Sequence, residues 1–408
     1  MPETLKTAHP DRPLPLLTYG LDYATHLKKH ITTKTYALVS HTLSKNTDVL
    51  STLQETLGKN LVAATTLQST AVYSDILNLI HDARTSKAET ILTIGEGSVI
   101  DTGKIVNLGL SNTVQTTSDL QNLTKNPPLT QPPKHPHIAL PTTLTGAEYT
   151  PLSSATDDTS PNNPRQTFRS RCPYLIILSP ALSSVTPLDV YLCSGVQAVE
   201  CCVETLLSSS SSSASSSGLD LKDELAARRG LEVLFTSLRR LKRGFGLGGE
   251  GCGVREGGEE RLSCALGVVN AMRACSGSVA LGASHGIGVQ LGAVGVGDGG
   301  ASCVLLKGVC WFNARVRENA VRQEGVRRFL VERGLVREDG GEDLGSVLDG
   351  FVCELGLPRS LSELGIRREQ LDQIAENSLL DGSCRTNPVP LTEKDQVMEI
   401  LNMVYERP

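Results

Sequence analysis

GEGSVIDTGK, residues 95–104, tells more about the fold of this chain than any other segment. It follows a short β-branched and apolar run, TILTI at residues 90–94, and leads into a stretch with helical spacing. A glycine turn between a strand and a helix points backbone N–H groups and the positive end of the helix at one spot, where an anion binds well. A left-handed turn without a ligand has the same composition, and the spacing is not the Rossmann G-x-G-x-x-G. Within an alternating α/β pattern, we interpret the turn as a site for a nucleotide pyrophosphate.

Strand-like and helical runs alternate on both sides of this turn. Such alternation predicts a parallel sheet that is covered by helices on both faces. We expect strands at 36–40, 61–65, 90–94, 138–140 and 174–178, and helices at 43–57, 71–83 and 99–108.

The character of the chain changes after Pro187, where strand-like runs disappear and apolar residues recur with helical spacing. The expected helices are at 189–207, 219–241, 261–276, 321–330 and 396–405. We therefore predict an α/β dinucleotide-binding domain over residues 1–187 and an all-α domain over residues 188–408. Residues 208–217 are nearly pure serine and residues 244–260 are rich in glycine and glutamate, so we expect both to be flexible insertions.

Composition excludes several classes of protein. The 408 residues carry a net charge of -5 and no basic stripe, which argues against nucleic acid as a partner. No run of 18 or more apolar residues exists, so we expect no membrane span. The 11 cysteines include no CxxC pair, which favours reduced thiols and a cytoplasmic location. The serine and glycine tracts suggest a eukaryotic, fungal secondary-metabolic setting.

Several motifs, in order, resemble those of the iron-containing alcohol dehydrogenase family. They are GEGSVIDTGK at 95–104, LPTTLTGAEYT at 140–150, SGVQAVECCVE at 194–204, GASHGIGVQLGAVGVGDGG at 282–300 and a late Asn387-Pro388. The LPTTLTGAEYT segment is similar to that of the maleylacetate reductase branch. The likeness extends from about residue 18 to the C-terminus, and it implies the fold shared with dehydroquinate synthase.

The resemblance also implies a cofactor, NAD(P)H, in a cleft between the two domains. Glu96 stands where the family has a glycine and adds a carboxylate beside the phosphates, which is unfavourable unless its side chain points into solvent. Carried over by position, the residues expected to bind the cofactor are Gly95, Gly97, Ser98, Asp101, Thr142, Thr143 and Thr145.

Members of this family hold a divalent cation with an Asp and three His, and here these positions have changed. The Asp and His that lie four apart on one helix fall on Gln197 and Cys201. Two His that lie fourteen apart fall on His285 and Gly299, and a further family His falls on Val289. We therefore expect no metal. A site rebuilt from Gln197, Cys201, His285 and the neighbouring Asp298 is the alternative, since Cys and His suit zinc, although Gln is a poor ligand.

His285 is the single histidine beyond residue 137, which makes it the first candidate for a proton donor, although a histidine bonded to the backbone in the core is the alternative. Cys201 is a second catalytic candidate, as a nucleophile, but the adjacent Cys202 favours a pair of buried structural thiols. Tyr149 is a third candidate, with packing as the alternative. The arginines at 165, 169 and 171 are either a carboxylate clamp or part of a solvated loop.

Three functions are compatible with these residues. The first is a metal-independent NAD(P)H-dependent oxidoreductase that reduces a keto or enol group of a small carboxylic acid or secondary-metabolite intermediate. The second is a non-redox isomerisation, elimination or cyclisation, in which the vacated cation cavity holds substrate. The third is a catalytically silent nucleotide-binding protein. The expected partner is a small-molecule substrate, and the family resemblance suggests a homodimer.

Overall fold

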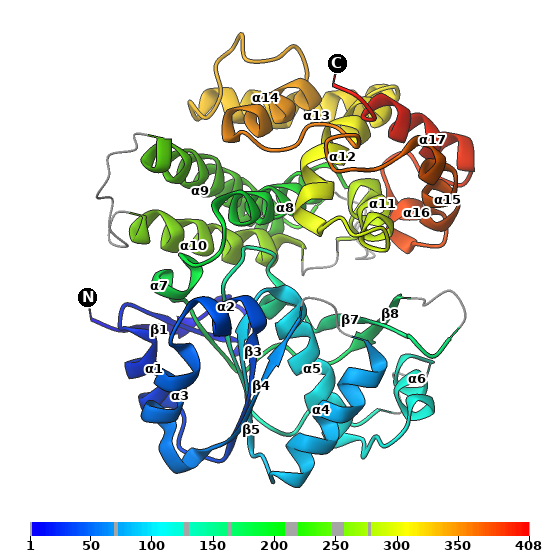
Figure 1. Ribbon diagram of the computed structural model, residues 1–408. Coiled ribbons are helices and arrows are strands. Elements are labelled where there is room, and N and C mark those ends of the chain that lie inside the picture. The colour runs from blue at the N-terminus through cyan, green and yellow to red at the C-terminus, as the bar shows by residue number, and fades with distance from the viewer. Residues whose placement is uncertain are drawn as a thin grey trace. The chain divides into compact units, whose positions relative to one another are not determined.

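The computed structural model describes residues 2–68, 72–125, 130–160, 165–208, 219–246, 257–275 and 279–407 (Figure 1). The chain divides into two compact units, Met1–Thr186 and Pro187–Pro408, next to the boundary expected from the sequence. The first unit is a parallel α/β structure and the second is helical. This confirms the predicted fold class.

A seven-stranded sheet forms the centre of the first unit, with the order β1-β2-β9-β6-β5-β3-β4. The β1–β2 pair is antiparallel, and all other neighbours in this sheet are parallel. A separate antiparallel hairpin is formed by β7 and β8. The strands are β1 (Thr4–Thr7), β2 (Leu16–Tyr19), β3 (Thr35–Ser40), β4 (Leu61–Leu67), β5 (Thr90–Gly95), β6 (His137–Pro141), β7 (Leu152–Thr156), β8 (Arg165–Arg169) and β9 (Leu175–Ile177).

Helices cover both faces of the sheet, as Figure 1 shows. Successive side chains of a strand point to opposite faces, so in β3 Tyr36 and Leu38 pack with α4 and α5, whereas Ala37 and Val39 pack with α1 and α3. Both sets are buried, which explains why the strand reads as one continuous apolar run. The helices are α1 (Tyr23–His30), α2 (His41–Asn46), α3 (Val49–Leu57), α4 (Tyr73–Thr85), α5 (Gly97–Ser111), α6 (Thr117–Lys125) and α7 (Pro180–Ser183), with 3-10 turns η1 (Gly58–Asn60) and η3 (Ala147–Tyr149).

The strand order changes direction at β3. The next strand in sequence, β4, pairs with one edge of β3, and the strand after that, β5, pairs with its other edge. In open α/β sheets, ligands bind beyond the carboxyl ends of the strands at such a switch point. Here these ends are Ser40 of β3 and Gly95 of β5.

The second unit consists of packed helices. One apolar core joins α11, α12, α15 and α17. α8 is long and apolar enough by composition to cross a membrane, but 78% of its most apolar stretch is buried inside the protein, as in a core helix. The helices are α8 (Leu188–Leu207), α9 (Leu221–Gly246), α10 (Gly258–Cys275), α11 (Ala283–Gly292), α12 (Asp298–Asn313), α13 (Arg317–Glu332), α14 (Leu344–Leu355), α15 (Arg368–Ser378), α16 (Gly382–Thr386) and α17 (Lys394–Met403).

The helix predicted over 43–57 and the two predicted insertions differ in part from the structure. The helix predicted over 43–57 is two helices, because the Thr47 hydroxyl bonds the Leu43 carbonyl oxygen at 2.6 Å and accepts the Val49 N–H at 3.2 Å, which ends α2. Of the predicted insertions, residues 209–217 and 247–256 lie outside the described residues. Both ends of the 244–260 segment are helical, because α9 reaches Gly246 and α10 begins at Gly258.

Candidate functional site

The glycine turn lies at the switch point of the sheet, and its two glycines leave no room for side chains. A Cβ on Gly95 would lie 2.9 Å from the Cβ of Ser40, and one on Gly97 would lie 2.6 Å from the Thr145 hydroxyl oxygen. Gly97 and Ser98 begin α5, where a helix offers no internal acceptor for the first N–H groups. The turn therefore presents free N–H groups and the positive helix end to an anion.

The loop that follows β6 lies beside this turn. The Thr142 N–H donates to the Gly95 carbonyl at 3.0 Å, and the Thr142 carbonyl accepts from the Thr186 hydroxyl at 2.8 Å. The hydroxyls of Thr143 and Thr145 lie 3.5 Å apart. Because β5 and β6 are parallel neighbours, the structure gathers six of the seven predicted cofactor residues at adjacent strand ends.

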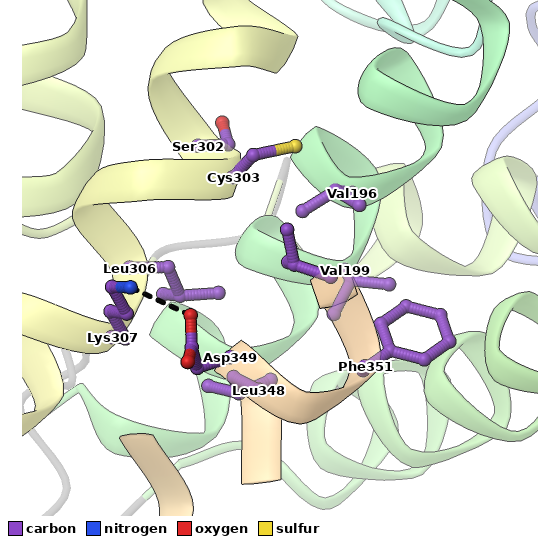
Figure 2. Close-up of a pocket in the computed structure, with 10 residues that line it drawn as sticks. Val196, Val199, Ser302, Cys303, Leu306, Lys307, Leu348, Asp349 and Phe351 are labelled. Carbon is purple, nitrogen blue, oxygen red and sulfur yellow. Dashed lines mark hydrogen bonds and ion pairs between the residues drawn. The ribbon is translucent and has the colours of Figure 1, made fainter. Parts of the chain in front are cut away.

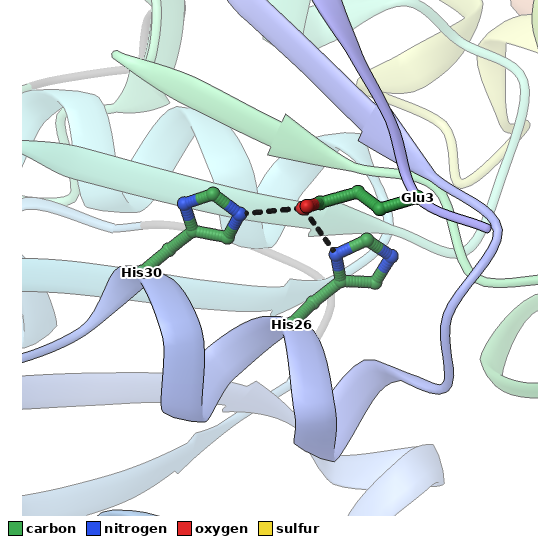
Figure 3. Close-up of side chains that lie close together, drawn as sticks. All are labelled: Glu3, His26 and His30. Atoms are coloured by element: carbon green, nitrogen blue, oxygen red, sulfur yellow. Dashed lines mark hydrogen bonds and ion pairs between the residues drawn. The ribbon is translucent and has the colours of Figure 1, made fainter.

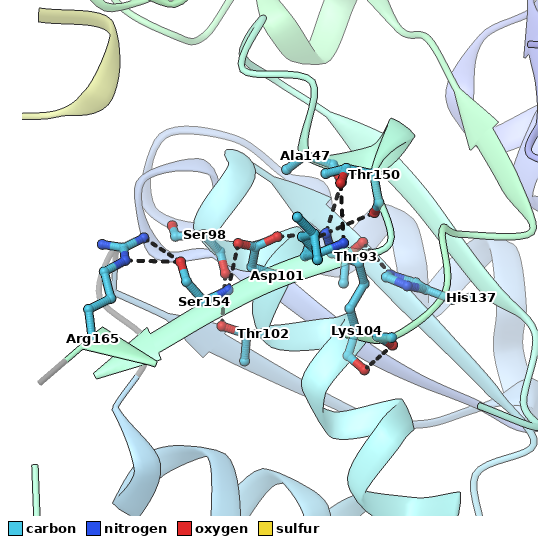
Figure 4. Close-up of polar contacts among 12 residues, drawn as sticks. Thr93, Ser98, Asp101, Thr102, Lys104, His137, Ala147, Thr150, Ser154 and Arg165 are labelled. Carbon is cyan, nitrogen blue, oxygen red and sulfur yellow. Dashed lines mark hydrogen bonds and ion pairs between the residues drawn. The ribbon is translucent and has the colours of Figure 1, made fainter. Parts of the chain in front are cut away.

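The seventh, Asp101, takes part in a brace behind the turn (Figure 4). Its carboxylate forms an ion pair with the buried Lys104 at 2.8 Å and accepts the Ser154 N–H at 3.1 Å. Lys104 also donates to the carbonyls of Ala147 at 2.9 Å and Thr150 at 3.3 Å. These contacts hold η3 and β7 onto α5. Direct contact of Asp101 with the cofactor stays a prediction.

Glu96 faces the turn rather than solvent alone. Its side chain is half-buried, and its carboxylate accepts the Ser98 hydroxyl at 3.4 Å. A negative charge here repels the phosphates that the turn would bind. That this carboxylate weakens nucleotide binding stays a prediction.

The family's metal positions do not fit a metal in this chain. A Cβ on Gly299, in α12, would lie 2.6 Å from both the carbonyl carbon and oxygen of Cys193, in α8. A histidine therefore cannot enter there unless the two helices move apart. A hydrogen bond with Cys275 and burial raise the pKa of Cys201 well above its ordinary value, which makes it a poor nucleophile. Gln197, which lies four residues before Cys201 on the same helix, offers only an amide oxygen, which is a weak metal ligand.

A small cavity between α8, α12 and α14 shows how closely these helices pack (Figure 2). Its volume is about 10 Å³, room for about one water. Lys307 and Asp349 form an ion pair of 2.6 Å at its edge, and Val196 and Leu306 line it. A substrate does not fit in this cavity.

Among the described residues, Glu3, His26 and His30 bring three metal-ligating atoms within 4.8 Å of one another (Figure 3). The Leu21 N–H donates to His26 Nε2 at 3.2 Å, so in the neutral ring Nδ1 carries the proton and faces Glu3 at 3.3 Å. A metal at this place would need the lone pair of Nδ1. Lys29 and His30 also bond the Glu3 carboxylate and lower its pKa to about 2. The group is better described as a carboxylate held by Lys29 and two histidines, here called the Glu3 clamp, than as a metal site.

His285 is half-buried in the first turn of α11, and two carboxylates of α8 lie beside that turn. Glu204 accepts the Ser284 N–H at 3.1 Å, and Glu200 accepts the hydroxyls of Ser284 and, at 2.8 Å, Ser302. Burial raises the pKa of both carboxyls, and their mutual repulsion adds to that of Glu200. Sequence reasoning missed them. The signal was present: two glutamates four residues apart in an otherwise apolar helix.

The other candidates are less well placed for chemistry. Tyr149 is 1% exposed, and its ring lies 6.0 Å from that of His9, which favours packing. Arg165 and Arg169 are exposed on β8, and Arg165 donates to the Ser154 hydroxyl at 2.9 Å. Arg171 is also exposed. The arginines therefore belong to a solvated hairpin and its neighbouring loop.

Models of one family match most of the chain. The iron-containing alcohol dehydrogenase model matches residues 17–180, and the model of the C-terminal part of the Fe-containing alcohol dehydrogenase family matches residues 259–405. Dehydrogenase ALT3 of Alternaria alternata is 32% identical over 82% of this chain and 88% of its own length. Dehydrogenase FUM7 of Gibberella moniliformis is 31% identical over 95% of this chain and 96% of its own length.

Solved structures share the fold. The maleylacetate reductase from a Rhizobium strain superposes with a TM-score of 0.67 at 18% identity, covering 94% of this chain and 92% of its own. Such low identity bears on the fold alone. The sequence matches carry the assignment: this chain belongs to the iron-containing alcohol dehydrogenase family, which depends on NAD(P), and it is an enzyme of the dehydrogenase and reductase kind.

Proposed function

We propose that the protein is a metal-independent NAD(P)H-dependent reductase that acts on a keto or enol group of a small carboxylic acid or a secondary-metabolite intermediate. The evidence for dinucleotide binding is the glycine turn at the switch point of the sheet. Thr142, Thr143 and Thr145 lie beside it. The chemistry supplied by the bound dinucleotide is hydride transfer. In this proposal the enzyme acts in the cytoplasm as a homodimer on a small molecule, without membrane or nucleic acid.

The single observation that supports metal independence is the contact of Gly299 with Cys193. It leaves no room for a ligand side chain at one of the family's four metal-binding positions. Without a Lewis acid, hydrogen bonds must stabilise the oxyanion that forms when a carbonyl is reduced. His285 is the imidazole available in the helical unit. We propose that it donates the proton to that oxygen.

The first test is a titration of the purified enzyme with NADH and with NADPH, in which nicotinamide fluorescence reports binding. The second test measures the oxidation of NAD(P)H in the presence of each member of a panel of small keto acids. Gly97→Ala should abolish binding, because its Cβ would lie 2.6 Å from the Thr145 hydroxyl. Gly325→Ala in α13 is the matched control, since a Cβ there meets no atom within 4 Å.

We expect the wild type and Gly325→Ala to bind and oxidise NAD(P)H, and His285→Gln to bind it with little turnover. Loss of one general acid costs about 100- to 10,000-fold in rate. Tight binding without oxidation on any acid of the panel would contradict the reductase and favour the non-redox reading. Failure to bind either nucleotide would contradict the reductase and also the catalytically silent nucleotide-binding protein.

A further inference from the structure

We propose that Glu204 and Asn387 form an external cap that positions His285, so that both are positioning residues for the proton donor. This inference rests on the role proposed above for His285. The cap joins three parts of the helical unit that lie far apart in sequence. They are α8, the first turn of α11 and the segment after α16.

The backbone N–H groups at the start of α11 have no acceptor within their own helix. Gly282 precedes the helix and has no side chain to supply one. Glu204 instead accepts the N–H groups of Gly282 at 2.9 Å, Ser284 at 3.1 Å and His285 at 3.5 Å. Asn387 Oδ1 accepts the remaining one, from Ala283, at 3.1 Å. Side chains from outside α11 therefore bind every N–H of this turn, including that of His285.

The approach of the cap requires a glycine. A Cβ on Gly282 would lie 2.9 Å from Glu204 Oε1 and 3.1 Å from Asn387 Oδ1. Any larger residue would push at least one of these oxygens away from the helix end. The GAS sequence before His285 is thus explained by the two side chains that bind it.

Both capping side chains are themselves held in place. Asn387 donates to the Asn313 side-chain oxygen at 2.7 Å and to the Val389 carbonyl at 2.7 Å, which fixes its own oxygen toward Ala283. Glu204 is buried with its carboxyl group at the positive end of α11, where its two oxygens accept the N–H groups of Gly282 and Ser284. Because both side chains are held in this way, they fix the position of the first turn of α11.

Glu200 extends the arrangement to the residue before His285. It accepts the Ser284 hydroxyl and, at 2.8 Å, the Ser302 hydroxyl, which ties the same turn to α12. The imidazole of His285 therefore projects from a turn whose backbone and neighbouring side chain are both bound. A proton donor must be held close to its productive geometry, and these contacts provide that hold.

The experiment compares Glu204→Gln and Asn387→Ala with Asp343→Ala. Asp343 caps α14 by accepting the Ser346 N–H at 2.8 Å, so its loss removes a cap of the same kind elsewhere in the helical unit. The first readout is the NMR signal of the His285 imidazole, identified by its absence in His285→Gln, with its titration. The second is kcat and KM for NAD(P)H-dependent reduction.

We expect the signal and the titration midpoint of His285 to shift in Glu204→Gln and Asn387→Ala but not in Asp343→Ala. We expect kcat to fall by about ten- to hundredfold in the first two, with KM nearly unchanged, since small displacements of a catalytic group have effects of this size. An unchanged His285 signal in both variants would overturn the proposal. If the wild type reduces no substrate, the proposed function fails, whereas the NMR comparison still decides whether the cap positions His285.

Discussion

Gly299 and Cys193 are in direct backbone contact: a Cβ on the glycine would lie 2.6 Å from the carbonyl carbon and oxygen of the cysteine. The contact joins α12 to α8 at the place where the family has one of its metal-binding histidines. Loss of the ligand is therefore more than a change of one side chain. The two helices leave no room for a side chain at this position, so a histidine there would require them to separate.

Gly299→Ala should lower the free energy of unfolding by about 1–3 kcal/mol, the usual cost of overpacking a tight interface. Gly325→Ala, inside α13, is the control, because a Cβ at that position meets no atom within 4 Å. Chemical denaturation measures both. Equal stability of the two variants would show that α8 and α12 are not in contact at Gly299.

Glu96→Gln should tighten NAD(P)H binding by about two- to tenfold at low salt, because it removes one negative charge beside the phosphates, worth about 1 kcal/mol at 4 Å in water. Its carboxylate now accepts the Ser98 hydroxyl at 3.4 Å. Glu55→Gln, exposed on α3, is the charge-matched control and should leave the affinity unchanged. Fluorescence titration decides. Affinity that does not change, or falls, in Glu96→Gln would mean that this carboxylate does not oppose the nucleotide.

Glu148 gives the nucleotide-binding unit a pH dependence. Burial raises the pKa of its carboxyl from 4.5 to about 7, and Oε2 has no hydrogen-bond partner among the described residues. The folded state therefore holds this proton more tightly than the unfolded state. The contribution to stability is present in full below pH 4.5 and is lost as the pH rises through about 7.

Glu148→Gln mimics the protonated carboxyl and should remove its share of the fall of the unfolding free energy between pH 4.5 and 7, while the buried carboxyls of Glu200 and Glu204 keep theirs. At about 1.4 kcal/mol for each unit of pKa shift, the gain over wild type above pH 7 is on the order of 3 kcal/mol. Urea denaturation across this pH range measures it. A fall of equal size in both proteins would show that Glu148 does not contribute to this pH dependence.

The Glu3 clamp predicts that chelation leaves the first unit intact. Treatment with EDTA should not change Tm, whereas Glu3→Ala should lower it, because the Glu3 carboxylate accepts bonds from His30 at 2.8 Å and Thr18 at 3.0 Å. Metal analysis should find no stoichiometric zinc. Zinc that copurifies with the wild type and is lost in His30→Ala would show that the group is a metal site after all.

The sequence predicts the fold well because its signals are local. The apolar runs of β3 and β5 and the glycine turn between β5 and α5 each have the spacing of the element that they form. Short edge strands such as β1, and the hairpin of β7 and β8, carry no such run and were missed. Their formation depends on partners that only the folded chain supplies.

The candidate site divides in the same way. Gly97 and the threonines after β6 were found because the turn and the family motif lie in continuous sequence. The cap on His285 was missed, because Glu204 and Asn387 meet the start of α11 only through hydrogen bonds between residues that lie 78 to 104 positions apart. Nor does any sequence signal show that Gly299 contacts Cys193.

The most direct measurement of the central claim is the rate of NAD(P)H oxidation by one preparation whose metal content is determined before and after exhaustive chelation. We predict the same rate per polypeptide at both points, with metal far below one atom per chain. A rate that falls in proportion to the metal removed, and returns when zinc or iron is added back, would contradict the account.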